Sequence, residues 1–187
     1  MRKLIYAINT TLDGCCDHTK FNPDEEIFMY YTQLMRDAGT LLYGRKTYQL
    51  MVPYWPDVAK DASAEPGMGL DFARAFAAVD KIVVFSKTLG SVEGEKTKIV
   101  RTDIAGEILK LKQEPGKDIL VHAGVSFPAH LAAHGLIDEY RIVVCPIVLG
   151  EGRRLFEGIN LPGKLQLKLV ESTVFKSGAV VLRYLKQ

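Results

Sequence analysis

The sequence has few cysteines, no long apolar run and almost no net charge, and each absence excludes a class of protein. Its three cysteines, Cys15, Cys16 and Cys145, make a poor disulfide framework and are typical of a reducing compartment. The longest strongly apolar stretch, Ile142–Leu149, is far shorter than the roughly 20 residues that a membrane span needs. The net charge of +2 gives no reason to expect a nucleic-acid partner or an anionic membrane.

What is present is the composition of a folded protein. Hydrophobic residues make up 48% and charged residues 25% of the 187 residues, which excludes disorder and collagen. We expect a single domain over residues 1–187, because domains usually run about 100–200 residues. The apolar stretch Leu4–Ile8 is too short for the apolar region of a signal peptide. We therefore expect a soluble, cytoplasmic protein.

Short β-rich runs alternate with helical patterns through most of the chain. The first helix is predicted to start with Asn22 as its N-cap, Pro23 at its first position and Glu25 at its third. Strands are predicted at residues 3–9, 40–43, 81–85, 97–100, 118–122 and 138–145. Helices are predicted between them, including residues 45–51, 72–79, 104–111 and 126–134, and residues 59–69 are predicted to be a polar loop.

The pattern becomes β-rich toward the C-terminus. Leucines alternate with polar residues over 165–169, and residues 174–176 and 179–185 indicate a hairpin with Ser177-Gly178 in its turn. Strands that are joined through helices must run mostly parallel, with helices on both faces of the sheet. We therefore predict an α/β fold with a mixed, mostly parallel central sheet and a C-terminal antiparallel hairpin.

Four segments follow strands, at the edge of the sheet where ligands bind in parallel α/β proteins. In the first, Gly44 allows a phosphate to approach the backbone, Arg45 supplies positive charge and Thr47 a hydroxyl. In the second, Ser86 and Lys87 again follow a strand with a hydroxyl and a cation. Both segments also fit a simpler interpretation, a glycine turn and a polar loop with solvated side chains.

The other two segments contain small residues. Ala123 and Gly124 would allow a diphosphate close to the backbone where a strand meets a helix, although such turns often contain glycine for structural reasons. Residues 7–14 lead from a strand into a Thr-Thr-Leu-Asp-Gly segment, which would border the reacting end of a ligand.

Other patterns fail to indicate a site. The segment 150–152, Gly-Glu-Gly, lacks the third glycine and the helix of a dinucleotide-binding fingerprint. Cys15, Cys16 and His18 have no second pair of metal ligands after them, so we expect no metal. No residue is assigned as catalytic. Three histidines are interpreted as strand-end and helix-surface residues: His122, His130 and His134.

Seven short motifs stand in one order along about 150 residues. They are TLDG at residues 11–14, LLYGRKTYQLM at 41–51, VPYWP at 52–56, KIVVFSKTL at 81–89, ILVHAGVSF at 119–127, HGLIDEYRI at 134–142 and PIVLGEGRRLF at 146–156. Together they resemble the dihydrofolate reductase superfamily. The closer resemblance is to the reductase domain of the bifunctional deaminase-reductase of riboflavin biosynthesis, in a stand-alone form without the deaminase's zinc motif.

The resemblance implies a three-layer α/β/α fold with an extended NADPH along the sheet edge. It implies that the nicotinamide lies near Ala7 and the Asp13-Gly14 loop. It places phosphate at Gly44, Arg45 and Thr47, the adenosine ribose along Ser86 and Lys87, and the diphosphate at the turn made by Ala123, Gly124, Val125 and Ser126. Arg45 and Lys87 would then flank the 2′-phosphate, which favours NADPH over NADH.

The sequence departs from the family pattern at two places. The family turn usually carries Gly-Gly with a cis peptide bond, whereas this chain has Ala123-Gly124. A cis bond between residues other than proline costs about 3–4 kcal/mol, so this turn keeps that geometry or relaxes it. Folate-specific members also carry a buried carboxylate on the first helix. Here the acidic residues 24–26 crowd the first turn of that helix and its inward face is apolar, which argues against folate.

The predicted function is an NADPH-dependent reductase that transfers hydride to a C=N or C=O group of a small heterocycle. It resembles the 5-amino-6-(5-phosphoribosylamino)uracil reductase of riboflavin biosynthesis. Asp13, Tyr48 and Trp55 are the candidates for substrate contact, with core packing as the alternative for the two aromatic residues. Other open possibilities are a reductase of an unrelated small molecule and an NADP(H)-binding sensor or scaffold without turnover. We also expect a homodimer that pairs through residues 138–147.

Overall fold

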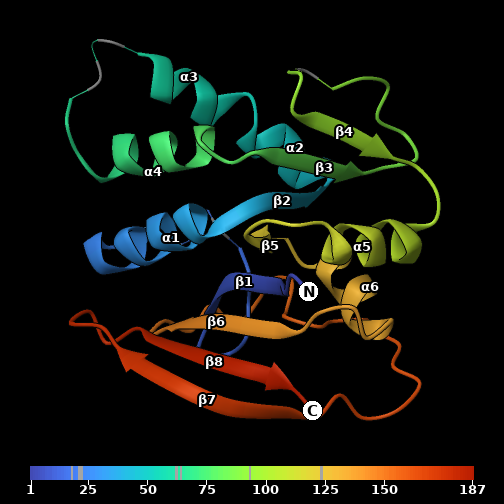
Figure 1. Ribbon diagram of the computed structural model, residues 1–187. Coiled ribbons are helices and arrows are strands. Elements are labelled where there is room, and N and C mark those ends of the chain that lie inside the picture. The colour runs from blue at the N-terminus through green and yellow to red at the C-terminus, as the bar shows by residue number, and fades with distance from the viewer. Residues whose placement is uncertain (18, 21–22, 62, 64, 93, 123) are drawn as a thin grey trace.

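The computed structural model consists of one eight-stranded sheet with helices on both faces (Figure 1). It describes residues 1–17, 19–20, 23–61, 63, 65–92, 94–122 and 124–187. The elements are β1 (Leu4–Thr11), α1 (Glu25–Asp37), β2 (Ala38–Gly44), α2 (Arg45–Met51), α3 (Tyr54–Lys60), α4 (Met68–Ala77), β3 (Lys81–Phe85), β4 (Thr97–Val100), α5 (Ile104–Gln113), β5 (Asp118–His122), α6 (Ser126–Ala133), β6 (Glu139–Cys145), β7 (Leu167–Val174) and β8 (Val180–Lys186). No helix in the described ranges is long and apolar enough to cross a membrane.

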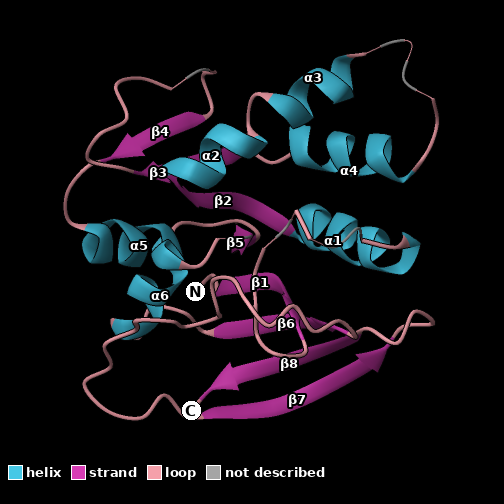
Figure 2. Cartoon of the chain, turned by 180° about the vertical axis from the view of Figure 1, so that it is seen from behind, coloured by secondary structure: helices cyan, strands magenta, loops and turns pink. Residues whose placement is uncertain are grey.

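The strands lie in the order β4-β3-β2-β5-β1-β6-β8-β7. The pairs from β4 to β6 are parallel, whereas β8 runs antiparallel to both β6 and β7. β7 and β8 extend the sheet beyond the helices (Figure 2). The predicted α/β fold, with a mostly parallel sheet and a C-terminal hairpin, is confirmed.

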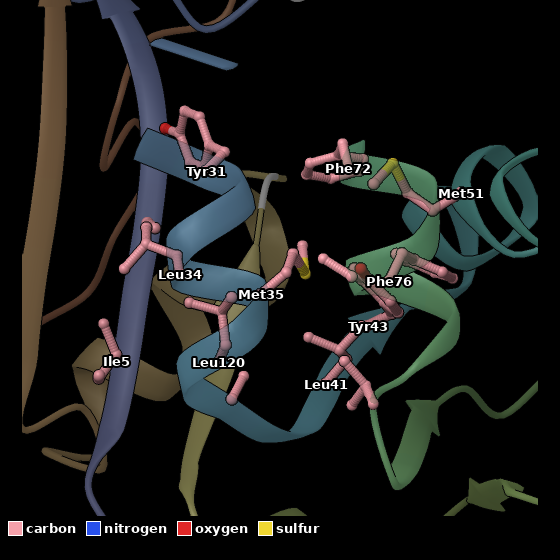
Figure 3. Close-up of a cluster of buried hydrophobic side chains, with 14 of the residues drawn as sticks. Ile5, Tyr31, Leu34, Met35, Leu41, Tyr43, Met51, Phe72, Phe76 and Leu120 are labelled. Atoms are coloured by element: carbon pink, nitrogen blue, oxygen red, sulfur yellow. The ribbon is translucent and has the colours of Figure 1, made fainter. Parts of the chain in front are cut away.

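Different helices cover the two faces of the sheet, because buried parallel strands need apolar contacts on both sides. On one face, α1, α2 and α4 pack over the central strands through residues such as Met35 and Phe76. Figure 3 shows Met35 pointing from α1 toward α4, with Tyr31 and Phe72 facing one another beyond it. On the other face, α5 and α6 contribute Ile108 and Leu131 to a second core.

Three helices differ from their prediction. α4 starts at Met68 rather than at residue 72, so both ends of the predicted loop 59–69 are helical. The other two differences, in α1 and α3, involve proline. The first helix begins at Glu25, where the Asp24 carboxylate accepts a hydrogen bond from the Ile27 N–H at 2.8 Å. The predicted N-cap Asn22 lies outside the described residues. The sequence also gave no indication of α3, in which Pro53 is the N-cap and Pro56 the third residue. The first N–H groups of a helix have no intrahelical acceptor, so proline there does not interrupt the helix.

The C-terminal hairpin turns at Gly178, whose φ of +84° is readily adopted by glycine. The strand before it, β6, has hydrogen-bonded neighbours on both sides, β1 and β8. Its backbone therefore cannot accept a further strand, so a second copy that contacts residues 138–147 would do so through side chains or through residues 146 and 147. A homodimer stays a prediction, and β7 at the end of the sheet has an unpaired edge for such a contact.

A buried carboxylate joins the tail strands through ion pairs. Glu139 on β6 is 1% exposed and accepts hydrogen bonds from Arg141 at 2.7 Å and from Arg183 at 2.8 and 3.2 Å. Burial alone would raise the pKa of Glu139, but the hydrogen bonds from Arg183 and Arg141 outweigh it and hold the pKa below its usual value. The charged form of Glu139 is thus the one that the folded state stabilises.

We expect Glu139→Gln to lower the free energy of unfolding at pH 7 by about 2–4 kcal/mol, because Arg141 and Arg183 then lose the buried carboxylate that they share. The carboxylate's contribution is complete above its unfolded pKa and is lost as the pH falls through the lower folded pKa. The variant should therefore lose less stability than the wild type between about pH 5 and pH 3. Urea unfolding across this range measures both effects.

Glu171→Gln is the matched control, since Glu171 is exposed and its carboxylate lies 3.1 Å from Arg183. Removing an exposed pair is worth less than about 1 kcal/mol. Equal stability of the Glu139→Gln variant and the wild type at pH 7 would show that the network contributes nothing to folding.

Candidate functional site

A cavity of about 810 Å³ opens where β1, β2 and β5 end. Ile8 and Asn9 of β1, Gly44 of β2 and His122 of β5 line it from the sheet. These strands are hydrogen-bonded neighbours, so their carboxyl ends meet at one edge. Ligand pockets commonly measure about 300–1,000 Å³ and lie at this edge in α/β proteins.

One end of the cavity is built from the starts of α2 and α6. Their N-caps, Gly44 and Val125, make no side-chain hydrogen bond to the first turn, so N–H groups there stay available. The two starts lie close together: a Cβ on Gly124, whose φ is +84°, would stand 3.0 Å from the Thr47 hydroxyl oxygen. The Tyr6 hydroxyl fixes the same turn by donating to the Gly124 carbonyl at 2.7 Å. Backbone donors of this kind bind anions.

Three cationic side chains line the cavity, two of them at this end. Arg45 and Lys46 are exposed in the first turn of α2, and Arg153 reaches the cavity from the loop after β6. None of the three takes part in a salt bridge within the described part of the chain. A bound phosphate would thus find positive charge that is not already neutralised.

The other end of the cavity is aromatic. Phe28 and Tyr31 of α1, Trp55 of α3 and Phe72 of α4 line it. The ring centres of Trp55 and Phe72 lie 4.6 Å apart at an angle of 62°. Figure 3 shows Tyr31 and Phe72 opposite one another, on helices that the core below holds together. Such walls suit a flat ring, which can pack against aromatic faces and edges.

His122 stands at the base of the aromatic end. Its ring centre lies 4.7 Å from that of Tyr31 and 6.1 Å from that of Phe72. Burial lowers the pKa of His122 to about 4, so the imidazole is neutral at pH 7. Its Nδ1 is buried and has no hydrogen-bond partner among the residues that the structure describes.

The structure brings seven of the predicted site residues together. Those that line the cavity are Gly44, Arg45, Thr47, Trp55, Gly124, Val125 and Ser126. Those that do not line it are Ala7, Asp13, Gly14, Tyr48, Ser86 and Lys87. Ala123, predicted at the diphosphate turn, lies outside the described residues.

Asp13, for which a substrate contact was predicted, has hydrogen bonds within the fold and is not among the residues that line the cavity. Its carboxylate accepts hydrogen bonds from the Thr11 hydroxyl at 2.6 Å and from the N–H groups of Leu149 and Gly150 at 3.2 and 2.9 Å. These bonds, first that of Thr11, hold the pKa of Asp13 well below its usual value. Asp13 thus ties the loop after β1 to the loop after β6, and Gly14, with a φ of +83°, belongs to the same turn.

The remaining residues lie beside the cavity rather than in its wall. Ala7 is fully buried within β1, and Tyr48 is buried in the core beneath α2. Phe85 pairs with Gly44, so Ser86 and Lys87 leave the sheet at the same edge as α2. The Ser86 hydroxyl oxygen accepts the N–H of Leu89 at 3.0 Å, whereas Lys87 is exposed.

Several residues of the wall were not predicted as site residues. Asn9 and His122 are the polar residues at the ends of two adjacent strands, and that position was the available signal for both. Arg153 had no such signal, because it follows an irregular loop. No cluster of three or more potential metal ligands occurs among the residues that the structure describes.

Comparison with known families identifies the family to which the chain belongs. The model of the RibD C-terminal domain matches residues 2–181. The uncharacterized protein YyaP of Bacillus subtilis (strain 168) is 32% identical over 186 residues, which cover 98% of this chain and 94% of that protein. The chain belongs to the RibD C-terminal domain family, as the motif resemblance predicted.

Solved structures show the same fold. A putative riboflavin biosynthesis protein from Shewanella sp. PV-4 is 22% identical with a TM-score of 0.72, over 99% of both chains. The deaminase/5-amino-6-(5-phosphoribosylamino)uracil reductase of Thermotoga maritima is 15% identical with a TM-score of 0.67, over 100% of this chain and 57% of that one. Dihydrofolate reductase from Enterococcus faecalis, complexed with NADP(H), is 12% identical with a TM-score of 0.64, over 99% of this chain and 96% of that one.

We expect His122 to make the protein less stable as the pH falls from about 6.5 toward 4. An unfolded histidine binds a proton near pH 6.5, whereas the folded protein resists protonation until about pH 4, so protons favour unfolding in this range. His122→Gln should show a shallower fall in the free energy of unfolding, measured by urea titration at pH 7, 5.5 and 4.5. Identical slopes for the wild type and the His122→Gln variant would contradict a buried neutral His122.

Proposed function

We propose that this protein is an NADPH-dependent reductase that transfers hydride to a C=N or C=O group of a small heterocycle. The observation that carries the proposal is that one cavity joins the starts of α2 and α6, with the cations Arg45 and Lys46, to an aromatic end. The phosphates of a dinucleotide need cations and free N–H groups, and a flat substrate ring beside the nicotinamide needs aromatic walls. Membership of the RibD C-terminal domain family supports the same assignment.

The residues present fit such a cofactor. Gly124 and Gly44 leave no side chain between the backbone and a ligand, and a Cβ on Gly44 would stand 3.2 Å from the Phe127 side chain. The N–H groups at the start of α6 and the hydroxyls of Thr47 and Ser126 would hold the diphosphate. Arg45, with Lys87 at the neighbouring strand end, would hold the additional 2′-phosphate.

The bound cofactor would supply the hydride, and the protein would supply position and shielding. Tyr31, Trp55 and Phe72 would fix the plane of the substrate and keep bulk water from its face. The described lining contains no aspartate or glutamate. Burial also raises the pKa of the Cys16 thiol to about 11, so the thiol stays protonated. We therefore assign solvent as the source of the proton that completes the reduction.

The substrate we propose is a pyrimidine or a related ring. The relative from Thermotoga maritima is named for reduction of 5-amino-6-(5-phosphoribosylamino)uracil, which makes this compound the first to assay. Arg153, on the rim of the cavity, could contact the phosphate of such a substrate. A protein that binds NADPH but reduces no member of a ring panel would instead be a binding protein.

We expect NADPH to quench the fluorescence of Trp55, the single tryptophan, and to bind at least tenfold more tightly than NADH. Arg45→Ala and Lys87→Ala should each weaken NADPH binding about tenfold and bring it close to NADH, because each removes a charge that contacts phosphate. Lys168→Ala, an exposed change on β7, is the matched control and should bind as the wild type does. Absence of saturable binding of either nucleotide would refute the proposed function.

A further inference from the structure

Asn9 enters the aromatic end of the cavity with one side of its amide already engaged. Its Oδ1 accepts a hydrogen bond from the Tyr31 hydroxyl at 2.7 Å. Figure 3 shows that hydroxyl pointing from α1 toward β1, the strand that carries Asn9. An amide whose oxygen is held in this way has its NH₂ group free to donate. No hydrogen bond of the Asn9 Nδ2 occurs within the described part of the chain.

His122 lies on the same face of the sheet as Asn9. Ala7 pairs with His122 across β1 and β5, and Asn9 follows Ala7 by two residues, so all three side chains project toward α1. The buried Nδ1 of His122 has no partner, and an unpaired N–H costs more than an unpaired lone pair. The proton of the neutral ring therefore resides on Nε2, and His122 is a second donor.

The described wall of the cavity around these two donors carries no negative charge. The described lining includes no carboxylate, and its charged side chains, Arg45, Lys46 and Arg153, are all positive. A protonated ligand ring would meet no counter-charge in this wall. A ligand ring that presents only hydrogen-bond donors would leave the Asn9 amide and the His122 imidazole unpaired. A neutral ligand ring with carbonyl oxygens would accept a hydrogen bond from each of them.

We propose that Asn9 and His122 select an uncharged ring that presents carbonyl oxygens to them, and that Tyr31 is the positioning residue for Asn9. The assignment rests on the proposed function, since it names the ring class that the reductase would accept. It distinguishes a dioxopyrimidine-type substrate from a diamino or protonated ring of the same shape.

Two bicyclic rings of equal size test the selection by direct binding. In 2,4-dioxopteridine two carbonyl acceptors stand where 2,4-diaminopteridine carries two amino donors. Titration calorimetry at pH 7 with the wild-type protein and saturating NADPH should give at least tenfold tighter binding of the dioxo ring. Equal affinity, or tighter binding of the diamino ring, would overturn the proposal.

Substitutions identify the responsible atoms. Asn9→Ala should abolish the preference, and Asn9→Asp, which replaces the donor by an acceptor, should reverse it toward the diamino ring. Tyr31→Phe should weaken binding of the dioxo ring by about three- to fivefold. Tyr30→Phe, the same change one residue earlier and outside the cavity lining, should leave this affinity unchanged. His122→Gln should retain more affinity for the dioxo ring than His122→Phe. If Asn9→Ala and His122→Phe both keep the preference for the dioxo ring, other groups are responsible for it and the proposal is wrong.

The affinity of every variant for NADPH, measured without a ring ligand, separates failure of the proposed function from failure of the ring selection. Wild-type protein that binds no NADPH would refute the proposed function. Normal NADPH binding together with equal affinity for the two rings would refute the selection alone. Asn9→Ala and Tyr31→Phe should change the affinity for NADPH less than the affinity for the dioxo ring, because neither residue is among the proposed phosphate contacts.

Discussion

The contact between the Gly124 turn and Thr47 is the constraint on which the site depends. It joins the starts of two helices that follow different strands, and a Cβ at Gly124 would stand 3.0 Å from the Thr47 hydroxyl oxygen. The Tyr6 hydroxyl holds the same turn from within the sheet. Because α2 and α6 begin side by side, their free N–H groups and the cations of α2 face one space. The aromatic end extends from that space between α1 and α4.

The distribution of charge follows from the same arrangement. The net charge of the whole chain is only +2, but the described wall of the cavity has cations and no carboxylates. Elsewhere carboxylates are engaged within the fold, as Glu139 is by Arg141 and Arg183, and as Asp13 is by two backbone N–H groups and a hydroxyl. The positive potential is thereby left at the strand ends, where a phosphorylated ligand would bind.

The sequence predicted the sheet and its mixed character, and it placed Gly44 and Gly124 at strand-to-helix turns that line the cavity, because periodicity and these glycines are local signals. It did not predict α3, since the prolines at 53 and 56 usually indicate a loop and only their positions in the first turn allow a helix. The hydrogen bonds of Asp13 were not predictable from the sequence, because they reach residues 149 and 150, far along the chain. Asn9 and His122 needed the β1–β5 register before their proximity could be recognised.

The central claim is that the starts of α2 and α6 form one binding site for the phosphates of NADPH. A titration of isotope-labelled protein with NADPH, followed through the backbone amide resonances, tests it most directly. The account predicts that the largest shifts occur at Gly44, Thr47 and residues 124–126, and that inorganic pyrophosphate shifts the amides of residues 124–126 in the same direction. Shifts confined to other surfaces, such as the loop between β4 and α5, or no shifts at all, would contradict it.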